Sequence, residues 1–267
     1  MIITLMLLTT LIWLATWILL YLRLRKPNLV PISKGFLHSL WFISLALHGA
    51  LILIPWLESH TLSLSFLNTL STVFWLSSFI LFIAQLSRPL EPLGLFIIPL
   101  MLPVIIISSL YHHQAAALPL NNGLGIHIFL SLLAYSMLAL AALQALVLAA
   151  QNRQLHNHQP GGLIKILPPL QDMEALLFGL IQVGLFLLSL GLISGFIYLD
   201  GFFGKQVAHK TILSILAWIT FSTLLFGHWR YGWRGRIAIR WTLLGFTLLM
   251  LAFFGSKFVL EYLIHST

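Results

Sequence analysis

Apolar runs long enough to cross a membrane recur along the whole chain and are separated by short polar intervals. A membrane-spanning helix needs roughly 20 predominantly apolar residues. Segments close to this length cover residues 2–21, 36–56, 66–87, 93–110, 123–151, 174–199, 209–228 and 238–263. The alternating pattern of a transmembrane β-barrel is absent, so these spans are predicted to be helices. We therefore predict an all-α, polytopic membrane helix bundle of about eight transmembrane helices, with residues 1–267 forming a single integral membrane domain.

The composition agrees with a surface that faces lipid. Only 7% of the residues are charged and 60% are hydrophobic, whereas about a quarter of the residues of a soluble domain are charged. Arg23, Arg25 and Lys26 follow the first span without a small-residue cleavage site, so this span is predicted to be retained. The chain contains no cysteine, which excludes disulfides, thiolate metal sites and CxxC chemistry.

Lysine and arginine are distributed unequally between the two sides of the predicted bundle. Only Lys205, Lys210 and Lys257 fall on one side. The loops after the odd-numbered spans hold the rest of the 14: Arg23, Arg25, Lys26, Lys34, Arg88, Arg153, Lys165, Arg230, Arg234, Arg236 and Arg240. Because cytoplasmic loops are enriched in these residues, we predict a multi-pass protein of the bacterial inner membrane with both termini periplasmic. The net charge of +8 then reflects membrane topology, and no nucleic-acid partner is expected.

One face of the fifth predicted span consists mainly of small residues. On a helix of 3.6 residues per turn, this face holds His127, Ser131, Ala134, Leu138, Ala142, Ala145 and Ala149. The sixth span has a similar face with Gly184, Gly191 and Gly195. Small residues allow helices to approach closely in lipid. We therefore expect His127 to lie on a face that packs against protein.

His127 and His209 are the two histidines that head predicted spans on the same side of the membrane. Imidazole is a common ligand of transition metals and of haem iron, so two such side chains from different helices could hold a haem between them. The alternative is that each is an interfacial residue with a polar tip. The spacing of the two residues alone leaves both interpretations open.

His48 differs because it lies inside a predicted span, about eight residues from its end. Ionisable side chains at such depth are rare and usually functional. The structural alternative is an imidazole hydrogen-bonded to a carbonyl or hydroxyl group of a neighbouring helix. Both interpretations of His48 stay open at this point.

No motif of an enzyme is present. The chain lacks a phosphate-binding glycine loop, a GxSxG motif and an HExxH motif. The six acidic residues all fall at or near span ends, which weakens a transporter hypothesis because transporters bind substrate near the membrane midplane.

Several short segments resemble the cytochrome c assembly membrane proteins of the CcsA/CcmC type, and more narrowly their short YpjD-like and HemX-like relatives. The resemblance covers about residues 120–262. It rests on Gly125-Ile126-His127, Ala134-Tyr135, Gln144-Ala145, Leu167-Pro168-Pro169-Leu170, Met173-Glu174, Gly191-Leu192-Ile193-Ser194-Gly195, His209-Lys210-Thr211, Ala217-Trp218, Gly232-Trp233-Arg234-Gly235 and Phe254-Gly255-Ser256-Lys257.

The resemblance implies haem at the outer face, held by histidines that flank a WGxxWxWD segment. His127 matches the first of these histidines. His209-Lys210-Thr211 stands in place of the tryptophan-rich segment, because Asp200 to Lys210 holds no tryptophan, and His265 is one residue out of register with the second histidine. This departure weighs more against haem delivery to apocytochrome than against haem binding.

We therefore expect a membrane protein without enzymatic activity that binds haem at the periplasmic face through His127 and His209. His48 is the third candidate residue, as a lower site or a residue on the haem path. The expected partners are membrane lipid, haem and other membrane proteins of cytochrome assembly or ion efflux. The alternative is a cofactor-free accessory or regulatory subunit, for example of an ion-efflux system. That alternative predicts that His127 and His209 hydrogen-bond to the backbone or to each other.

Overall fold

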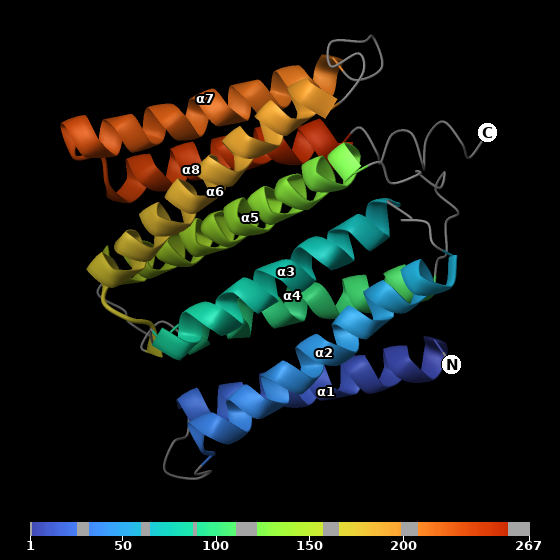
Figure 1. The fold of residues 1–267 in the computed structure, drawn as a ribbon. Coiled ribbons are helices and arrows are strands. Elements are labelled where there is room, and N and C mark those ends of the chain that lie inside the picture. Colours follow the sequence, from blue (N-terminus) through green and yellow to red (C-terminus); the bar gives the residue numbers. More distant parts are fainter. Residues whose placement is uncertain are drawn as a thin grey trace. The chain divides into compact units, whose positions relative to one another are not determined.

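The computed structural model describes residues 2–25, 32–59, 65–87, 90–110, 122–156, 166–198 and 208–255. Within these ranges, eight α-helices follow one another (Figure 1). They are α1 (Ile2–Arg25), α2 (Lys34–Ser59), α3 (Phe66–Ser87), α4 (Glu91–Leu110), α5 (Asn122–His156), α6 (Leu170–Tyr198), α7 (Ala208–Tyr231) and α8 (Gly235–Met250). A π-helical segment, η2 (Leu251–Gly255), continues α8.

The prediction of a helical membrane bundle is confirmed. In the described part of the chain, eight helices are long and apolar enough to cross a membrane, and no strand occurs there. Several helices are longer than the apolar runs, because helical backbone continues past the residues that lie in the hydrocarbon. Thus α1 extends to Arg25 and α5 to His156.

The chain folds as two compact units. Unit 1 comprises residues 1–119 and 161–168, and unit 2 comprises residues 120–160 and 169–267. Unit 1 therefore contains α1 to α4, and unit 2 contains α5 to α8 and η2. Whether the two units act as the single domain expected for residues 1–267 stays a prediction.

In unit 1 each helix contacts two others, so that the four form a closed bundle. α1 packs against α2 and α4, and α3 packs against the same two helices. Trp13 and Trp41 are almost fully buried and meet edge to face at 6.0 Å between ring centroids. Gly94 of α4 provides the space for the Trp41 ring, because a Cβ atom at that position would lie 2.5 Å from it.

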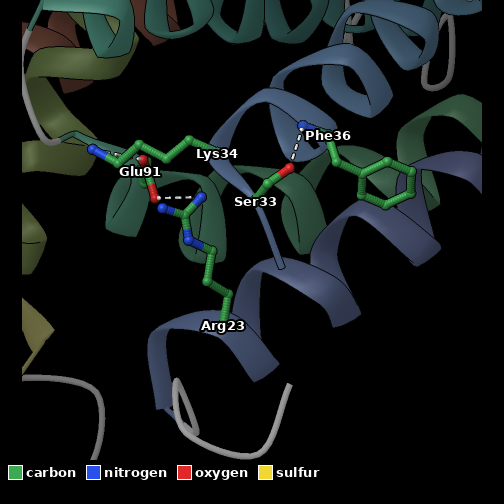
Figure 2. Close-up of polar contacts among 5 residues, drawn as sticks. All are labelled: Arg23, Ser33, Lys34, Phe36 and Glu91. Carbon is green, nitrogen blue, oxygen red and sulfur yellow. Dashed lines mark hydrogen bonds and ion pairs between the residues drawn. The ribbon is translucent and has the colours of Figure 1, made fainter. Parts of the chain in front are cut away.

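One carboxylate joins three helices of unit 1. Oε2 of Glu91, the first residue of α4, lies 3.7 Å from an Arg23 guanidinium nitrogen, and Oε1 lies 3.7 Å from the Lys34 ammonium (Figure 2). Arg23 lies in the last turn of α1, and Lys34 is the first residue of α2. The neighbouring Ser33 caps α2 by accepting a hydrogen bond from the Phe36 backbone N–H at 3.2 Å.

In unit 2 the most extensive helix pair is α5 with α6. The small-residue face of α5 packs against protein, as predicted: Ala134 and Ala145 are fully buried, and Ser131 lies against Gly191 of α6. Leu138 lies against Gly184, where a Cβ atom would come within 2.7 Å of it. α8 also packs on α5, and α7 packs on both α6 and α8.

The last helix of unit 2 agrees with the predicted span 238–263 as far as the described residues reach. α8 begins at Gly235 and passes into η2 after Met250, whereas residues 256–263 lie outside the described residues. The hydroxyl group of Tyr135 on α5 donates a hydrogen bond of 2.5 Å to the carbonyl of Leu249, two residues before η2 begins. A π-helical turn leaves the hydropathy of the segment unchanged, so an apolar run cannot reveal it.

Candidate functional site

His127 lies in the second turn of α5 and is directed toward α6. Its Nδ1 atom lies 3.0 Å from the Gly191 carbonyl oxygen and 3.2 Å from the Ser194 hydroxyl oxygen. The Ser194 hydroxyl in turn donates a hydrogen bond of 2.8 Å to the same carbonyl. The predicted position of His127 on the packing face is therefore confirmed.

These contacts determine which ring nitrogen of His127 carries hydrogen. A carbonyl oxygen can only accept, so the Nδ1 atom must donate to Gly191. In the neutral imidazole the lone pair is then on Nε2, which is the atom left to bind a metal. A hydrogen bond from the other ring nitrogen to a backbone carbonyl is also the usual support of a metal-bound histidine. The contact with the Gly191 carbonyl thus favours the tautomer of His127 in which Nε2 can bind a metal.

His209 lies at the same end of unit 2 as His127. Gly191 and Ser194 belong to the last two turns of α6, which ends at Tyr198, and α7 begins at Ala208 and packs back along α6 (Figure 1). His209 is exposed in the first turn of α7. Among the described residues no hydrogen bond or ring contact joins the two imidazoles. The pairing of His127 with His209 around one ligand stays a prediction.

His48 belongs to unit 1 and is fully buried on α2. Its Nε2 atom lies 3.0 Å from the Ser71 hydroxyl oxygen on α3. Next to it, Trp75 fits against Gly49 and donates a hydrogen bond of 2.8 Å to the Leu45 carbonyl. The hydrogen bond expected of a structural histidine is therefore present. The Nδ1 atom is buried and has no hydrogen-bond partner among the described residues.

His228 has a structural environment at the other end of unit 2. Its ring stacks on Phe178 at 3.6 Å between centroids, and its Nδ1 atom lies 2.8 Å from the Trp233 carbonyl oxygen. The Trp233 ring lies against Gly227, where a Cβ atom would overlap it. These contacts assign His228 to the turn between α7 and α8. His265 and residues 200–207 lie outside the described residues.

Two groups that support the site were not identified from the sequence. They are the Ser194 hydroxyl and the Gly191 carbonyl, both on the α6 face marked by Gly191 and Gly195. The glycine spacing indicated a packing face, and Ser194 lies one turn from Gly191 on that face. The glycine spacing could therefore have suggested that Ser194 contacts a residue of α5. It does not indicate which residue of α5 that is.

The donor set suits haem better than a metal ion bound by protein alone. In the described segments, no group of three or more histidine, cysteine or acidic side chains lies close enough to hold a metal. A porphyrin supplies the equatorial ligands of its iron, so a haem needs only axial imidazoles. His127, with Nδ1 engaged and Nε2 available, fits such a role.

Comparison with known proteins agrees with the sequence resemblance. The sequence profile of the family described as Cytochrome C assembly protein matches residues 4–264, so the match begins far before residue 120. Inner membrane protein YpjD of Escherichia coli K12 is 36% identical over 169 residues, which are 60% of this chain and 64% of that protein. The same protein of E. coli O157:H7 gives the same values. A protein of Azospirillum brasilense, described as an uncharacterized 28.8 kDa protein in the nifR3-like 5′ region, is 32% identical over 206 residues, or 73% of this chain and 76% of that one.

The chain thus spans about two thirds of the E. coli relatives, 64% of their length. No solved structure matches the chain. The eight apolar helices of the described part, with the similarity to an inner membrane protein, place the chain in the inner membrane as a multi-pass protein. The match over residues 4–264 shows that this chain belongs to the cytochrome c assembly protein family.

Proposed function

We propose that the protein binds haem at the periplasmic face of the inner membrane, with the imidazoles of His127 and His209 as axial ligands. In this proposal haem is the cargo, and the protein carries out no covalent chemistry on it. The periplasmic placement rests on the distribution of lysine and arginine, which assigns the end of unit 2 with His127 and His209 to the outer side. The absence of tryptophan from Asp200 to Lys210 favours holding haem over delivering it to apocytochrome.

The single observation that carries this proposal is the hydrogen bond between His127 Nδ1 and the Gly191 carbonyl oxygen, 3.0 Å long. It leaves Nε2 as the atom that can bind iron, and it fixes the ring between two helices that pack closely. His209 adds a second, exposed imidazole at the same end of unit 2. His48 of unit 1 is the third proposed residue, as a lower site or a residue on the haem path, because its Nδ1 atom is buried and has no partner in the described part.

The test is haem binding by the full chain in mild detergent. Haem is added to the wild type and to a His127→Ala/His209→Ala double variant, and absorption spectra are recorded in the oxidised and reduced states. The matched control is His156→Ala, which removes an exposed histidine from the other end of α5. We expect a Soret band in the wild type and the control, and its loss in the double variant. A wild type whose spectra with haem are the same as those of empty micelles with haem would contradict the proposal.

A second candidate function is a cofactor-free accessory or regulatory subunit, for example of an ion-efflux system. The observation that favours it is the same bond from His127 to the Gly191 backbone, because this bond can also serve packing alone. The two functions differ in the role of Nε2. If haem does not bind and His127→Ala merely lowers thermal stability, the accessory function becomes the better interpretation.

A further inference from the structure

The segment formed by the end of α7, the turn that follows it and the beginning of α8 is strongly cationic. It carries Arg230, Arg234, Arg236 and Arg240, all of which are exposed. Within the described part of the chain, none of these arginines takes part in an ion pair, whereas Arg23 and Lys34 share Glu91. Unneutralised arginines on one short segment attract an anion from outside the protein.

The backbone of this turn is held in a fixed shape. Gly232 and Gly235 have φ angles of +67° and +55°, in the left-handed region that favours glycine. The Gly235 backbone N–H donates a hydrogen bond of 2.8 Å to a carboxylate oxygen of Glu174 on α6. On the other side of the turn, the Trp233 backbone N–H donates to the Gly227 carbonyl at 3.2 Å. The arginines therefore project from a scaffold that is already ordered.

Aromatic side chains accompany the arginines. Trp229 is 81% exposed and Tyr231 is 67% exposed, although both are large and partly apolar. The Arg230 guanidinium lies over the Tyr231 ring at 5.7 Å from its centroid. Exposed tryptophan and tyrosine at the end of a membrane span are typical of the depth at which lipid headgroups lie.

The outward face of α8 changes from cationic to apolar along its length. Arg236 and Arg240 lie one turn apart, and the same face continues with Leu244, which is 52% exposed, and with the exposed Thr247, whose hydroxyl is bonded to the Leu243 carbonyl. At the start of η2 the face ends with Leu251, also 52% exposed. This order matches a phospholipid, in which a phosphate group lies above acyl chains. A soluble anion would satisfy the arginines but would make no use of this apolar continuation.

We propose that the arginine turn, defined as Trp229–Arg240, is a binding site for the headgroup of an anionic phospholipid. The guanidinium groups of Arg236 and Arg240 bind the phosphate, since arginine matches its geometry with paired N–H donors. Arg230 and Arg234 supply further positive charge, which favours a headgroup with net negative charge over a zwitterionic one. The acyl chains lie along the apolar face beyond Arg240. This site is separate from the proposed haem ligands and does not depend on them.

The experiment measures lipid binding to the full chain by native mass spectrometry. Phosphatidylglycerol or phosphatidylcholine is added to the wild type, to Arg236→Gln/Arg240→Gln, and to Arg25→Gln/Arg153→Gln. The last variant loses the same charge from exposed positions outside the arginine turn. We expect the wild type to prefer phosphatidylglycerol and the first variant to bind it about thirtyfold more weakly, because each of the two basic residues removed contributes about 1 kcal/mol near an anionic surface. The control variant is expected to bind it almost as the wild type does.

Three results would overturn the proposal. They are equal binding of the two lipids by the wild type, equal losses in the two double variants, or displacement of phosphatidylglycerol by millimolar inorganic phosphate. The last result would identify a free phosphate as the ligand. If the first double variant does not fold, Arg234→Gln is compared with Arg153→Gln by the same criteria.

Discussion

His127 on α5 and Ser194 on α6 both hydrogen-bond the carbonyl oxygen of Gly191, at 3.0 and 2.8 Å. The hydroxyl oxygen of Ser194 is also 3.2 Å from His127 Nδ1. The imidazole is therefore held by one backbone group and by a side chain that shares that group. This arrangement makes Ser194 a positioning residue for the proposed haem ligand.

The first prediction concerns this positioning role. Ser194→Ala removes the hydroxyl group and leaves the Gly191 carbonyl in place, so His127 keeps one of its two contacts. We expect haem affinity to fall about tenfold, the lower end of the effect of residues that support a metal ligand, and the Soret maximum to shift. Ser189→Ala on the same helix is the matched control, because the Ser189 hydroxyl accepts a hydrogen bond from the Trp218 indole N–H of α7 and donates one to the Leu185 carbonyl, away from His127. Haem titration with an unchanged affinity and spectrum in Ser194→Ala would show that Ser194 does not position the ligand.

The second prediction concerns the close approach of α5 and α6. A Cβ atom at Gly184 would lie 2.7 and 2.8 Å from two atoms of Leu138, which is fully buried and has little room to move. Gly184→Ala is therefore expected to lower the free energy of unfolding by about 1–3 kcal/mol. At Gly179 on the same helix no atom lies within 4 Å of an added Cβ.

Gly179→Ala serves as the control for this change, because both substitutions improve helix propensity to the same extent. It is expected to leave stability unchanged or slightly higher. Thermal unfolding in detergent distinguishes the two variants. Equal midpoints for Gly184→Ala and Gly179→Ala would mean that the helices are not in close contact at Gly184.

The third prediction concerns the charges that join α1, α2 and α4 in unit 1 (Figure 2). Glu91→Gln removes the only carboxylate that pairs with Arg23 in the described part, and one nitrogen of that guanidinium is buried without a hydrogen-bond acceptor there. We expect a loss of about 1–3 kcal/mol in stability, between the values for exposed and for buried ion pairs. Lys34→Gln is expected to cost less than about 1 kcal/mol, because the Lys34 side chain is 66% exposed. Chemical unfolding that ranks the two variants in the opposite order would contradict this assignment.

The fourth prediction concerns the end of α8. Tyr135→Phe removes a buried hydrogen bond to the Leu249 carbonyl and keeps the ring that packs on Phe253 at 5.6 Å between centroids. We expect a loss of about 1–2 kcal/mol in stability and faster amide hydrogen exchange in Leu251–Gly255. Tyr231→Phe, at an exposed position, is the control. Unchanged exchange in Tyr135→Phe would show that the hydroxyl group does not stabilise η2.

Much of the fold could be predicted because hydropathy and small-residue spacing are local properties of the chain. The predicted span 66–87 coincides with α3, and the small-residue face of α5 packs against protein as expected, with Ser131 against Gly191 of α6. The division into two units and the π-helical end of α8 could not be predicted in this way. Both features depend on which faces of the helices are in contact. The composition of an apolar run is the same whichever of its faces packs against another helix, so it does not reveal them.

The candidate site was predictable to a smaller extent. The position of His127 on a packing face followed from its spacing to Ser131 and Ala134, but its partner on α6 depends on how two helices are rotated against each other. The sequence also indicated that His48 lies inside a span, whereas its contact with Ser71 depends on how α2 and α3 pack against each other. A sequence indicates which face a residue occupies, and it does not indicate what lies opposite.

The position of Glu91 also constrains the order in which unit 1 can be assembled during synthesis. Arg23 and Lys34 leave the ribosome first. The Glu91 carboxylate that pairs with both follows only after α2 and α3 have been synthesised. A nascent chain that ends at Ser87 therefore holds two cations without their shared counter-charge. The bundle of unit 1 can close around its charges only after the fourth helix has entered the membrane, so insertion of α4 completes this part of the protein.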